Sequence, residues 1–412
     1  MSFHAPLLSI LAFSTAALAQ TQVASPETVF VAKTEAENRF SFHGYSTINY
    51  YHFDWQTDPE RRDAVDLERV ALEFDYRLSP RIFVQSEIEF EHGGTGSTME
   101  LDKFEEAGEY EAEIEKGGEV KIEELSVGFL LHPMLNVRLG HFFVPIGFAA
   151  ALDEPTDYFT VERSEAERAL LPVLWDETGV ELFGELPGVR YQVQMVNGLD
   201  ASGFSSANWV ALGHQGRFET VNADNWALAA RFDATGIPFT QVGVSGYFGN
   251  SRDNRPKHDM VSPAYVGIVS GHAQWRYGPF VLRGLGIWGG LSNSEAVTLV
   301  NKNQGTLLGA KNTPVASQAY AAFGEAGVDV LSLAGVSRQS GFVFARVDAY
   351  DTMWKTQGNV SDNPAWERRT ITGGINYKPH SQLVLKGQYA HRLNGHDQVE
   401  NTLSLGLGVV VF

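Results

Sequence analysis

One interval of the chain, residues 145–177, concentrates side chains that can bind ions or orient polar solutes. Its candidate residues are four acids and two bases, namely Asp153, Glu154, Asp157, Glu162, Arg163 and Arg168. Carboxylates and guanidiniums create a local field when they face each other across a gap, and they neutralise one another when they pair. The residue types leave both arrangements open.

Each arrangement predicts a different role for these groups. In the first, the two arginines of the interval join Arg138 and Arg190 as the cationic side of a constriction, and the four acids form the opposite side. In the second, Glu162 and Arg163 hold the interval in place through salt bridges and hydrogen bonds to a surrounding wall.

The interval is also apolar enough to pack against other parts of the chain. Its apolar residues are Phe159, Val161, Leu170, Leu171, Val173, Leu174 and Trp175. A connection of roughly thirty residues without regular structure is normally either functional or disordered. We expect residues 145–177, called here the inserted loop, to pack inside a barrel and to narrow it.

The elements that must position this loop are amphipathic strands. In residues 69–78, apolar and charged residues alternate, and residues 81–91 repeat the pattern after a turn at Ser79-Pro80. Alternation over about ten residues is the length that a tilted strand needs to cross a bilayer.

The same unit recurs to the end of the chain and predicts a 16-stranded antiparallel transmembrane β-barrel. Short turns alternate with long connections, as in bacterial outer-membrane barrels. The expected strand centres are Thr47, Phe74, Ile88, Ser126, Leu139, Leu182, Val193, Leu228, Val244, Ser270, Gly284, Phe323, Ala345, Gly373, Lys386 and Gly406.

The alternation also predicts which charged residues face the lumen. The candidates for the wall of a pore are Arg69, Glu73, Arg77, Arg138, Arg190, Arg231, Arg346 and Lys386, with Asp75, Glu87, Glu89 and Glu181 on the same faces. Pores select ions by rings of one sign. This mixed set therefore predicts weak or cation-leaning selectivity.

Composition bounds the compartment and the partners. Residues 1–19 are expected to be a signal peptide removed near Ala19, residues 20–38 a flexible segment and residues 39–412 the barrel. The chain has no cysteine, which excludes disulfides and thiolate chemistry, and a net charge of −19, which argues against nucleic acid as a partner. Residues 92–119 are expected to be a strongly acidic loop that is either simply solvated or bridges divalent cations and lipopolysaccharide.

Some residues match patterns of catalytic or cofactor-binding proteins. Gly284, Gly286 and Gly289 match a dinucleotide fingerprint in spacing, but they end a strand without opening a helix, so we interpret them as close-packed wall glycines. A barrel-embedded hydrolase would need only a serine and a histidine, and His141 and His272 lie in strands, as does His391. We expect interface or lumen roles for these histidines, no enzymatic activity and no cofactor or metal.

The middle and the end of the chain resemble the phosphate-selective porin O and P family. The motifs are Gly140-His141-Phe142, Val161-Glu162-Arg163-Ser164, Glu177-Thr178-Gly179-Val180 and Asn401 to Gly408. The resemblance implies a 16-stranded outer-membrane barrel, usually a homotrimer, with the third long loop inside and phosphate-like anions as solutes. The chain departs from the family in charge, with 31 Lys and Arg against 50 Asp and Glu.

The functional expectation is therefore an outer-membrane channel of a Gram-negative cell for small hydrophilic solutes or ions. The alternative is a structural or surface-binding barrel whose lumen is plugged. The expected partners are outer-membrane lipid, lipopolysaccharide and the assembly machinery, which would read the C-terminal Phe412.

Overall fold

The computed structural model describes residues 39–102, 111–148, 152–215, 220–303 and 312–411, all within one compact unit. The expected signal peptide (1–19), the flexible segment (20–38) and Phe412 lie outside the described residues.

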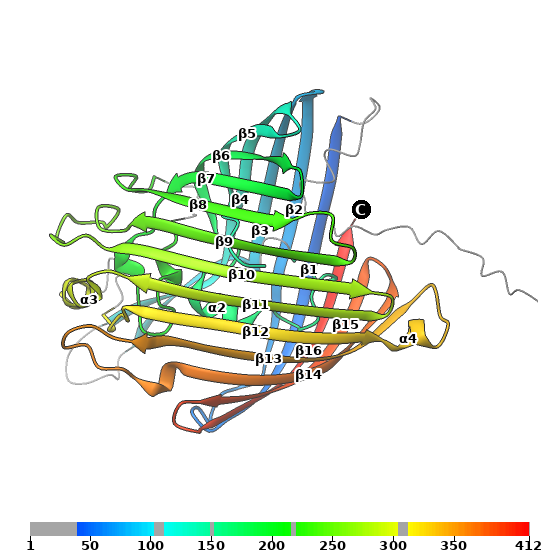
Figure 1. The fold of residues 1–412 in the computed structure, drawn as a ribbon. Helices are drawn as coiled ribbons and strands as arrows, with labels where there is room; N and C mark the ends of the chain where they lie inside the picture. Colours follow the sequence, from blue (N-terminus) through cyan, green and yellow to red (C-terminus); the bar gives the residue numbers. More distant parts are fainter. Residues whose placement is uncertain (1–38, 103–110, 149–151, 216–219, 304–311, 412) are drawn as a thin grey trace, which may run out of the picture. The chain divides into compact units, whose positions relative to one another are not determined.

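Sixteen antiparallel strands form a closed barrel in which each strand pairs with its sequence neighbours and β1 pairs with β16 (Figure 1). The strands are β1 (Phe40–Trp55), β2 (Ala64–Ser79), β3 (Ile82–Asp102), β4 (Glu111–His132), β5 (Leu135–Phe143), β6 (Asp176–Leu186), β7 (Val189–Asn197), β8 (Trp226–Ala234), β9 (Thr240–Asn250), β10 (Tyr265–Tyr277), β11 (Phe280–Leu291), β12 (Gln318–Asp329), β13 (Ser340–Lys355), β14 (Glu367–His380), β15 (Leu383–Asn394) and β16 (Val399–Val411). Each of the sixteen expected centres lies in its strand, so the predicted fold class is confirmed.

Helices are confined to the connections. They are α2 (Glu165–Leu170), α3 (Ser294–Lys302), α4 (Val330–Leu333) and the 3-10 turns η2 (Ala201–Gly203), η3 (Ala211–Gly213) and η5 (Pro364–Trp366). Within the part of the chain that the structure describes, none of the helices has the length and apolar character to span a bilayer.

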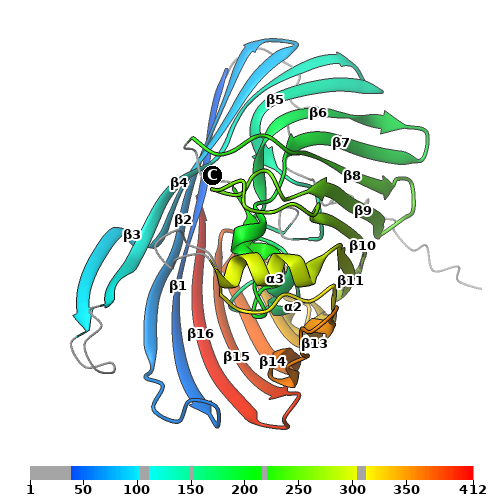
Figure 2. The same cartoon turned by 90° about the vertical axis from the view of Figure 1, so that its left-hand side faces the viewer.

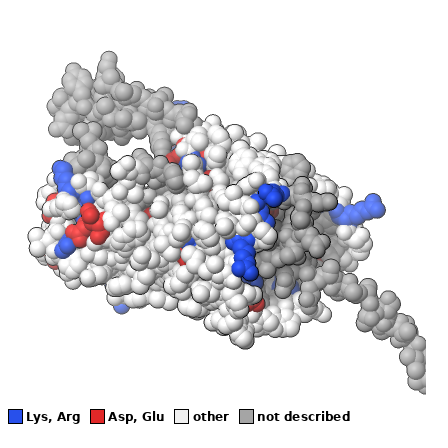
Figure 3. All heavy atoms as spheres, turned by 90° about the horizontal axis from the view of Figure 1, so that it is seen from above, with Lys and Arg blue, Asp and Glu red and all other residues white. Residues whose placement is uncertain are grey.

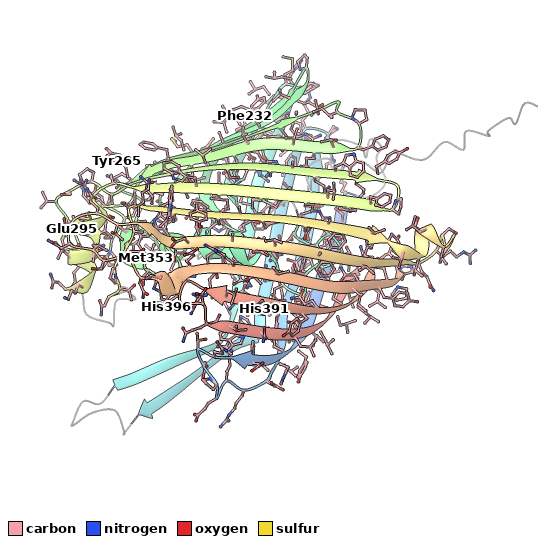
Figure 4. The ribbon with its side chains drawn as sticks, turned by 60° about the horizontal axis from the view of Figure 1, so that its bottom comes forward. Phe232, Tyr265, Glu295, Met353, His391 and His396 are labelled. Carbon is pink, nitrogen blue, oxygen red and sulfur yellow. The ribbon has the colours of Figure 1, made fainter. Side chains whose placement is uncertain are left out.

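Alternating side chains separate an inner from an outer face along each strand. In β10, Val266, Ile268 and Ser270 are buried inside, whereas Tyr265 and Val269 are exposed outside. Figure 4 shows Tyr265 of β10 and Phe232 of β8 on the outer side of the sheet. The outer surface seen in Figure 3 is mostly free of charged groups between its two ends. This is the pattern that a lipid-facing barrel requires, because charges on the lipid face are destabilising.

The connections differ in length between the two rims. The turns after β2, β4, β6, β8, β10 and β14 are short, and the β12–β13 connection is longer because it contains α4. The connections on the opposite rim include the inserted loop between β5 and β6 and the segment with α3 between β11 and β12.

One predicted loop is largely a pair of strands. The sequence interpretation placed a connection at residues 92–119, but β3 continues to Asp102 and β4 starts at Glu111, with pairing from Gly96–Gly118 to Asp102–Glu111. Figure 2 shows this hairpin reaching beyond the neighbouring strands. The acidic composition obscured a period of two in the sequence, where Glu111 and Glu113 alternate with Ala112 and Ile114.

The apolar core of the structure lies inside the barrel on one side. It joins inward-facing residues of β8–β13 with residues of the connections, and it includes Phe148, Leu170, Trp175, Phe204, Trp209, Ile268, Leu285, Val297 and Phe323. Figure 2, which looks toward the rim of long connections, shows the ribbon around α2 within the ring of strands. The packed connections therefore fill the β8–β13 side of the lumen.

Candidate functional site

The two ends of the inserted loop lie side by side where the loop leaves the wall. Val144 N donates to Trp175 O at 2.6 Å, which brings the two ends of the loop together. Shortly after Val144, Gly147 has φ of +76°, and a Cβ there would lie 2.1 Å from Glu167 Oε1. The Glu167 carboxylate accepts from Phe148 N at 2.7 Å. A glycine at this position lets the loop turn sharply onto its own helix α2.

Basic side chains of the wall hold the loop by its backbone. Lys386 of β15 donates to Tyr158 O at 3.0 Å and to Thr160 O at 2.8 Å. Three further wall bases act in the same way, and the bonds are Lys378 Nζ to Thr156 O at 2.5 Å, Arg283 to Asp157 O at 2.6 Å and Arg231 to Gly147 O at 2.7 Å. Arg346 donates instead to a loop side chain, at Ser164 Oγ, at 2.5 Å. These cations come from β8, β11, β13, β14 and β15, so the loop is attached along most of one side of the lumen.

Aromatic packing reinforces the same attachment. The Phe159 ring lies 5.3 Å from that of Phe342 and 5.4 Å from that of Phe344, measured between centroids. A Cβ on Gly327 of β12 would come within 2.3 Å of the Phe159 ring. The absence of a side chain at Gly327 lets the ring lie directly on the wall.

Four of the six predicted constriction residues form two ion pairs. Arg163 pairs with Asp153, and Arg168 pairs with Glu162. Tyr45 of β1 joins the first pair, because its hydroxyl donates to Asp153 Oδ1 at 3.0 Å and accepts from Arg163 at 3.2 Å. The predicted cationic and acidic groups of the loop are therefore in contact with each other.

The pKa values of two loop carboxyls are shifted in opposite directions, because burial dominates at one and its partners dominate at the other. It raises the pKa of Glu154 to about 7, an effect that the neighbouring charges of Asp157 and Asp153 increase. Burial would also raise the pKa of Glu162, but Arg168 and the Tyr51 hydroxyl together hold it below its usual range. Glu162 is accordingly the more firmly ionised of the two.

The remaining predicted residues lie on the wall. Arg69 pairs with Glu89 at 2.5 Å and Glu91 at 2.8 Å, and Arg138 pairs with Glu181 at 2.8 Å and Glu124 at 3.0 Å. Nearer the rim of short turns, Arg77 is half-buried and Arg190 lies 3.8 Å from Glu185. On β2, Glu73 lies directly opposite Glu87 of β3.

Two important wall bases were missed by the sequence interpretation. Arg283 lies in the alternating pattern of β11 on the face of Val281 and Leu285, so strand parity could have identified it. Lys378 lies near the end of β14, directly before Pro379. The residue types alone carried no signal that either would donate to a loop carbonyl.

A polar cavity remains beside the inserted loop, on the side of β1–β4. Its volume is about 460 Å³. Its lining includes six acids and four bases, namely Asp66, Glu68, Glu91, Glu119, Glu123, Glu162, Arg69, Lys121, Arg163 and Arg168. Lys121 bonds Asp176 at 2.7 Å, and the three arginines are also paired with carboxylates as described above.

The three strand histidines are engaged with polar partners. His141 Nε2 lies 2.7 Å from Asp176 Oδ2, His272 Nε2 lies 2.6 Å from Asp233 Oδ1, and His391 Nδ1 lies 2.8 Å from Asn401 Oδ1. Such bonds fit structural roles in the wall.

Comparisons with known proteins support the fold. No family model matches the chain. An uncharacterized protein of Aquifex aeolicus (strain VF5) is 25% identical over 366 residues, which cover 88% of this chain and 78% of that protein.

Solved structures with a similar fold include the outer membrane channel DcaP of Acinetobacter baumannii, with a TM-score of 0.55, 10% identity, and coverage of 90% of this chain and 97% of that chain. A loop L8 deletion mutant of OmpT of Vibrio cholerae has a TM-score of 0.54 at 10% identity, covering 91% of this chain and 100% of that chain. An anion-selective porin of Comamonas acidovorans has a TM-score of 0.52 at 10% identity, covering 90% and 99%. The chain thus has the barrel fold of outer-membrane porins.

Proposed function

We propose that this chain forms a water-filled channel in the outer membrane of a Gram-negative cell. Small hydrophilic solutes and ions would cross by passive diffusion, without a catalytic step or a cofactor. The long connections would face the outside and the short turns the periplasm, as is usual for such barrels. Lipid and lipopolysaccharide would surround it, and the outer-membrane assembly machinery would insert it.

The observation that carries the proposal is that charged side chains have different partners on the two sides of the inserted loop. Wall bases on the β8–β15 side donate to the loop itself, as with Lys386 and Arg283. The cavity on the β1–β4 side is lined by more acids than bases, and its bases are paired. A solute on that side would meet a surplus of carboxylates, which favours cations at a constriction.

This charge distribution favours weak, cation-leaning selectivity over selectivity for phosphate. Phosphate-binding sites rely on arginines and lysines that are free to donate to the anion. Here Lys386 and Arg346 donate to loop atoms, and Arg138 donates to two carboxylates. Phosphate-like solutes would therefore have few available donors in the described part of the lumen.

Reconstitution tests whether the lumen conducts. Purified protein added to a planar bilayer should give discrete conductance steps, and liposomes that contain it should swell in small sugars. Wild-type protein that is folded but gives neither steps nor swelling would overturn the proposal.

That negative result would instead support the second candidate, a barrel with a plugged lumen. The observation that favours this candidate is the density of contacts around the loop, from Tyr45 on β1 to Lys386 on β15. Replacing the loop by a short glycine-serine linker should leave a channel of similar type but larger conductance if the lumen is open, and should create conductance for the first time if it is plugged.

A further inference from the structure

Three carboxylates converge between the inserted loop and the acidic wall. Glu73 of β2 and Glu87 of β3 lie directly opposite each other on the inner face, an arrangement that is unfavourable for like charges. Asp153 of the inserted loop joins them, so that one carboxylate oxygen from each residue lies within 4.8 Å of the other two. The loop thus places a third negative charge where two already repel.

Charge and burial leave this group incompletely balanced. Arg163 pairs with Asp153, and the nearby Arg69 pairs with Glu89 and Glu91. Three carboxylates and one guanidinium carry a net charge of −2 when all are ionised. Glu87 is only 4% exposed, and its Oε1 has no hydrogen-bond partner among the described residues. A buried carboxylate oxygen without a donor points to a missing positive partner.

The donor set selects a class of partner. All three ligands are carboxylate oxygens, which suit hard cations such as Ca²⁺, whereas zinc sites usually include histidine or cysteine. Two oxygens bound to one Ca²⁺ at about 2.3–2.6 Å lie at most about 5 Å apart. The separations within 4.8 Å are compatible with this limit.

We propose that Glu73, Glu87 and Asp153 bind one divalent cation of the calcium class. The ion links the inserted loop to β2 and β3, whereas Lys378 and Lys386 attach the loop to β14 and β15. The loop would then be attached to some strands by protein cations and to others by a bound cation. Binding at this site goes beyond the proposed channel function and does not require conductance.

The test is calorimetric titration of the folded full chain in detergent with Ca²⁺, after treatment with a chelator. Wild type should show one saturable site per chain. Glu87→Gln and Asp153→Asn should each weaken it by at least about tenfold, because affinity follows the number of charged ligands. The matched control is Glu68→Gln, which also removes one carboxylate charge. Glu68 lies on β2, like Glu73, but lines the cavity, so this variant should keep the site.

Two results would overturn the proposal. One is folded wild-type protein without saturable Ca²⁺ binding. The other is equal Ca²⁺ affinity in wild type, both cluster variants and the control, which would locate binding elsewhere, for example on the acidic β3–β4 hairpin. If Glu87→Gln does not fold, Asp153→Asn decides the question, since its substitution lies in the loop and leaves the strands intact. Absence of channel activity would not affect either result.

Discussion

Individual side chains in the lumen act mainly on the inserted loop. Lys386 is 6% exposed and donates to two loop carbonyls. Its ammonium group therefore positions the loop backbone. Charge-assisted hydrogen bonds of this kind are stronger than neutral ones. A base that faces the lumen therefore need not be a base that meets the solute.

Replacing Lys386 tests this role. Lys386→Met leaves the Tyr158 and Thr160 carbonyls without this donor. The free energy that holds the loop against the wall should decrease by roughly 1–3 kcal/mol. We expect noisier single-channel currents and faster proteolysis within the loop. Lys355→Met, at an exposed end of β13, is the control and should behave as wild type. Equal noise and equal proteolysis in both variants would show that Lys386 does not hold the loop.

The Glu162–Arg168 pair gives a pH prediction. The pKa of Glu162 in the folded protein is below the ordinary carboxylate value. The pair therefore stabilises the fold at pH values above the ordinary pKa, and this contribution is lost as the pH falls through the lower folded pKa. Glu162→Gln should reduce the free energy of unfolding at pH 7 by up to about 1 kcal/mol, the value for a partly exposed pair. The melting temperature should fall slightly as a result. The difference between variant and wild type should vanish in strong acid. A difference that stays constant from neutral to strongly acid pH would contradict this account.

At the scale of elements, the inserted loop and the wall form one unit with two unlike sides. Apolar packing and basic donors fix the loop against β8–β15, whereas the cavity lies against β1–β4. The asymmetry arises because Arg283, Arg346 and Lys386 lie on β11, β13 and β15, whereas the acid-rich strands are β2–β4.

Single cysteines can test how these elements are oriented, because the chain has no native cysteine. Val261, in the long connection before β10, is 92% exposed, and Leu333, in the opposite rim, is 62% exposed. On intact cells, a large maleimide-polymer should label Val261→Cys and leave Leu333→Cys unlabelled until the outer membrane is permeabilised. The reverse pattern would invert the proposed topology.

The strands were predictable because apolar and polar residues alternate along a strand whose two faces meet different surroundings. The same signal placed Arg231, Arg346 and Lys386 in the lumen. It failed at the β3–β4 hairpin, where a dense run of glutamates concealed the alternation.

The pairing inside the inserted loop was less accessible to sequence reasoning. Asp153 and Arg163 are ten positions apart in a segment without a repeating structure, and their contact depends on the three-dimensional path of the loop and on Tyr45. Sequence alone could name the residues, but it could not choose between opposed and paired charges.

At the scale of the whole molecule, the outer face is suited to lipid and to other copies of the chain. Exposed apolar residues such as Val244, Phe248 and Ile375 cover the outside of the strands. We propose a homotrimer, which the resemblance of the sequence to a porin family of usually trimeric members implies. Unheated protein in a mild detergent should have three times the mass of one 45.3 kDa chain, less any removed signal, by light scattering. A monomer mass at every concentration would exclude this assembly.

The central claim is that acids outnumber bases in the cavity beside the inserted loop, and the reversal potential in a KCl gradient tests it most directly. The account predicts a modest preference for K⁺ that decreases when Glu68→Gln and Glu123→Gln remove carboxylates from the cavity lining. It also predicts little change with Glu185→Gln, a matched substitution near the rim of short turns. A clear preference for chloride or phosphate in the wild-type channel would contradict it.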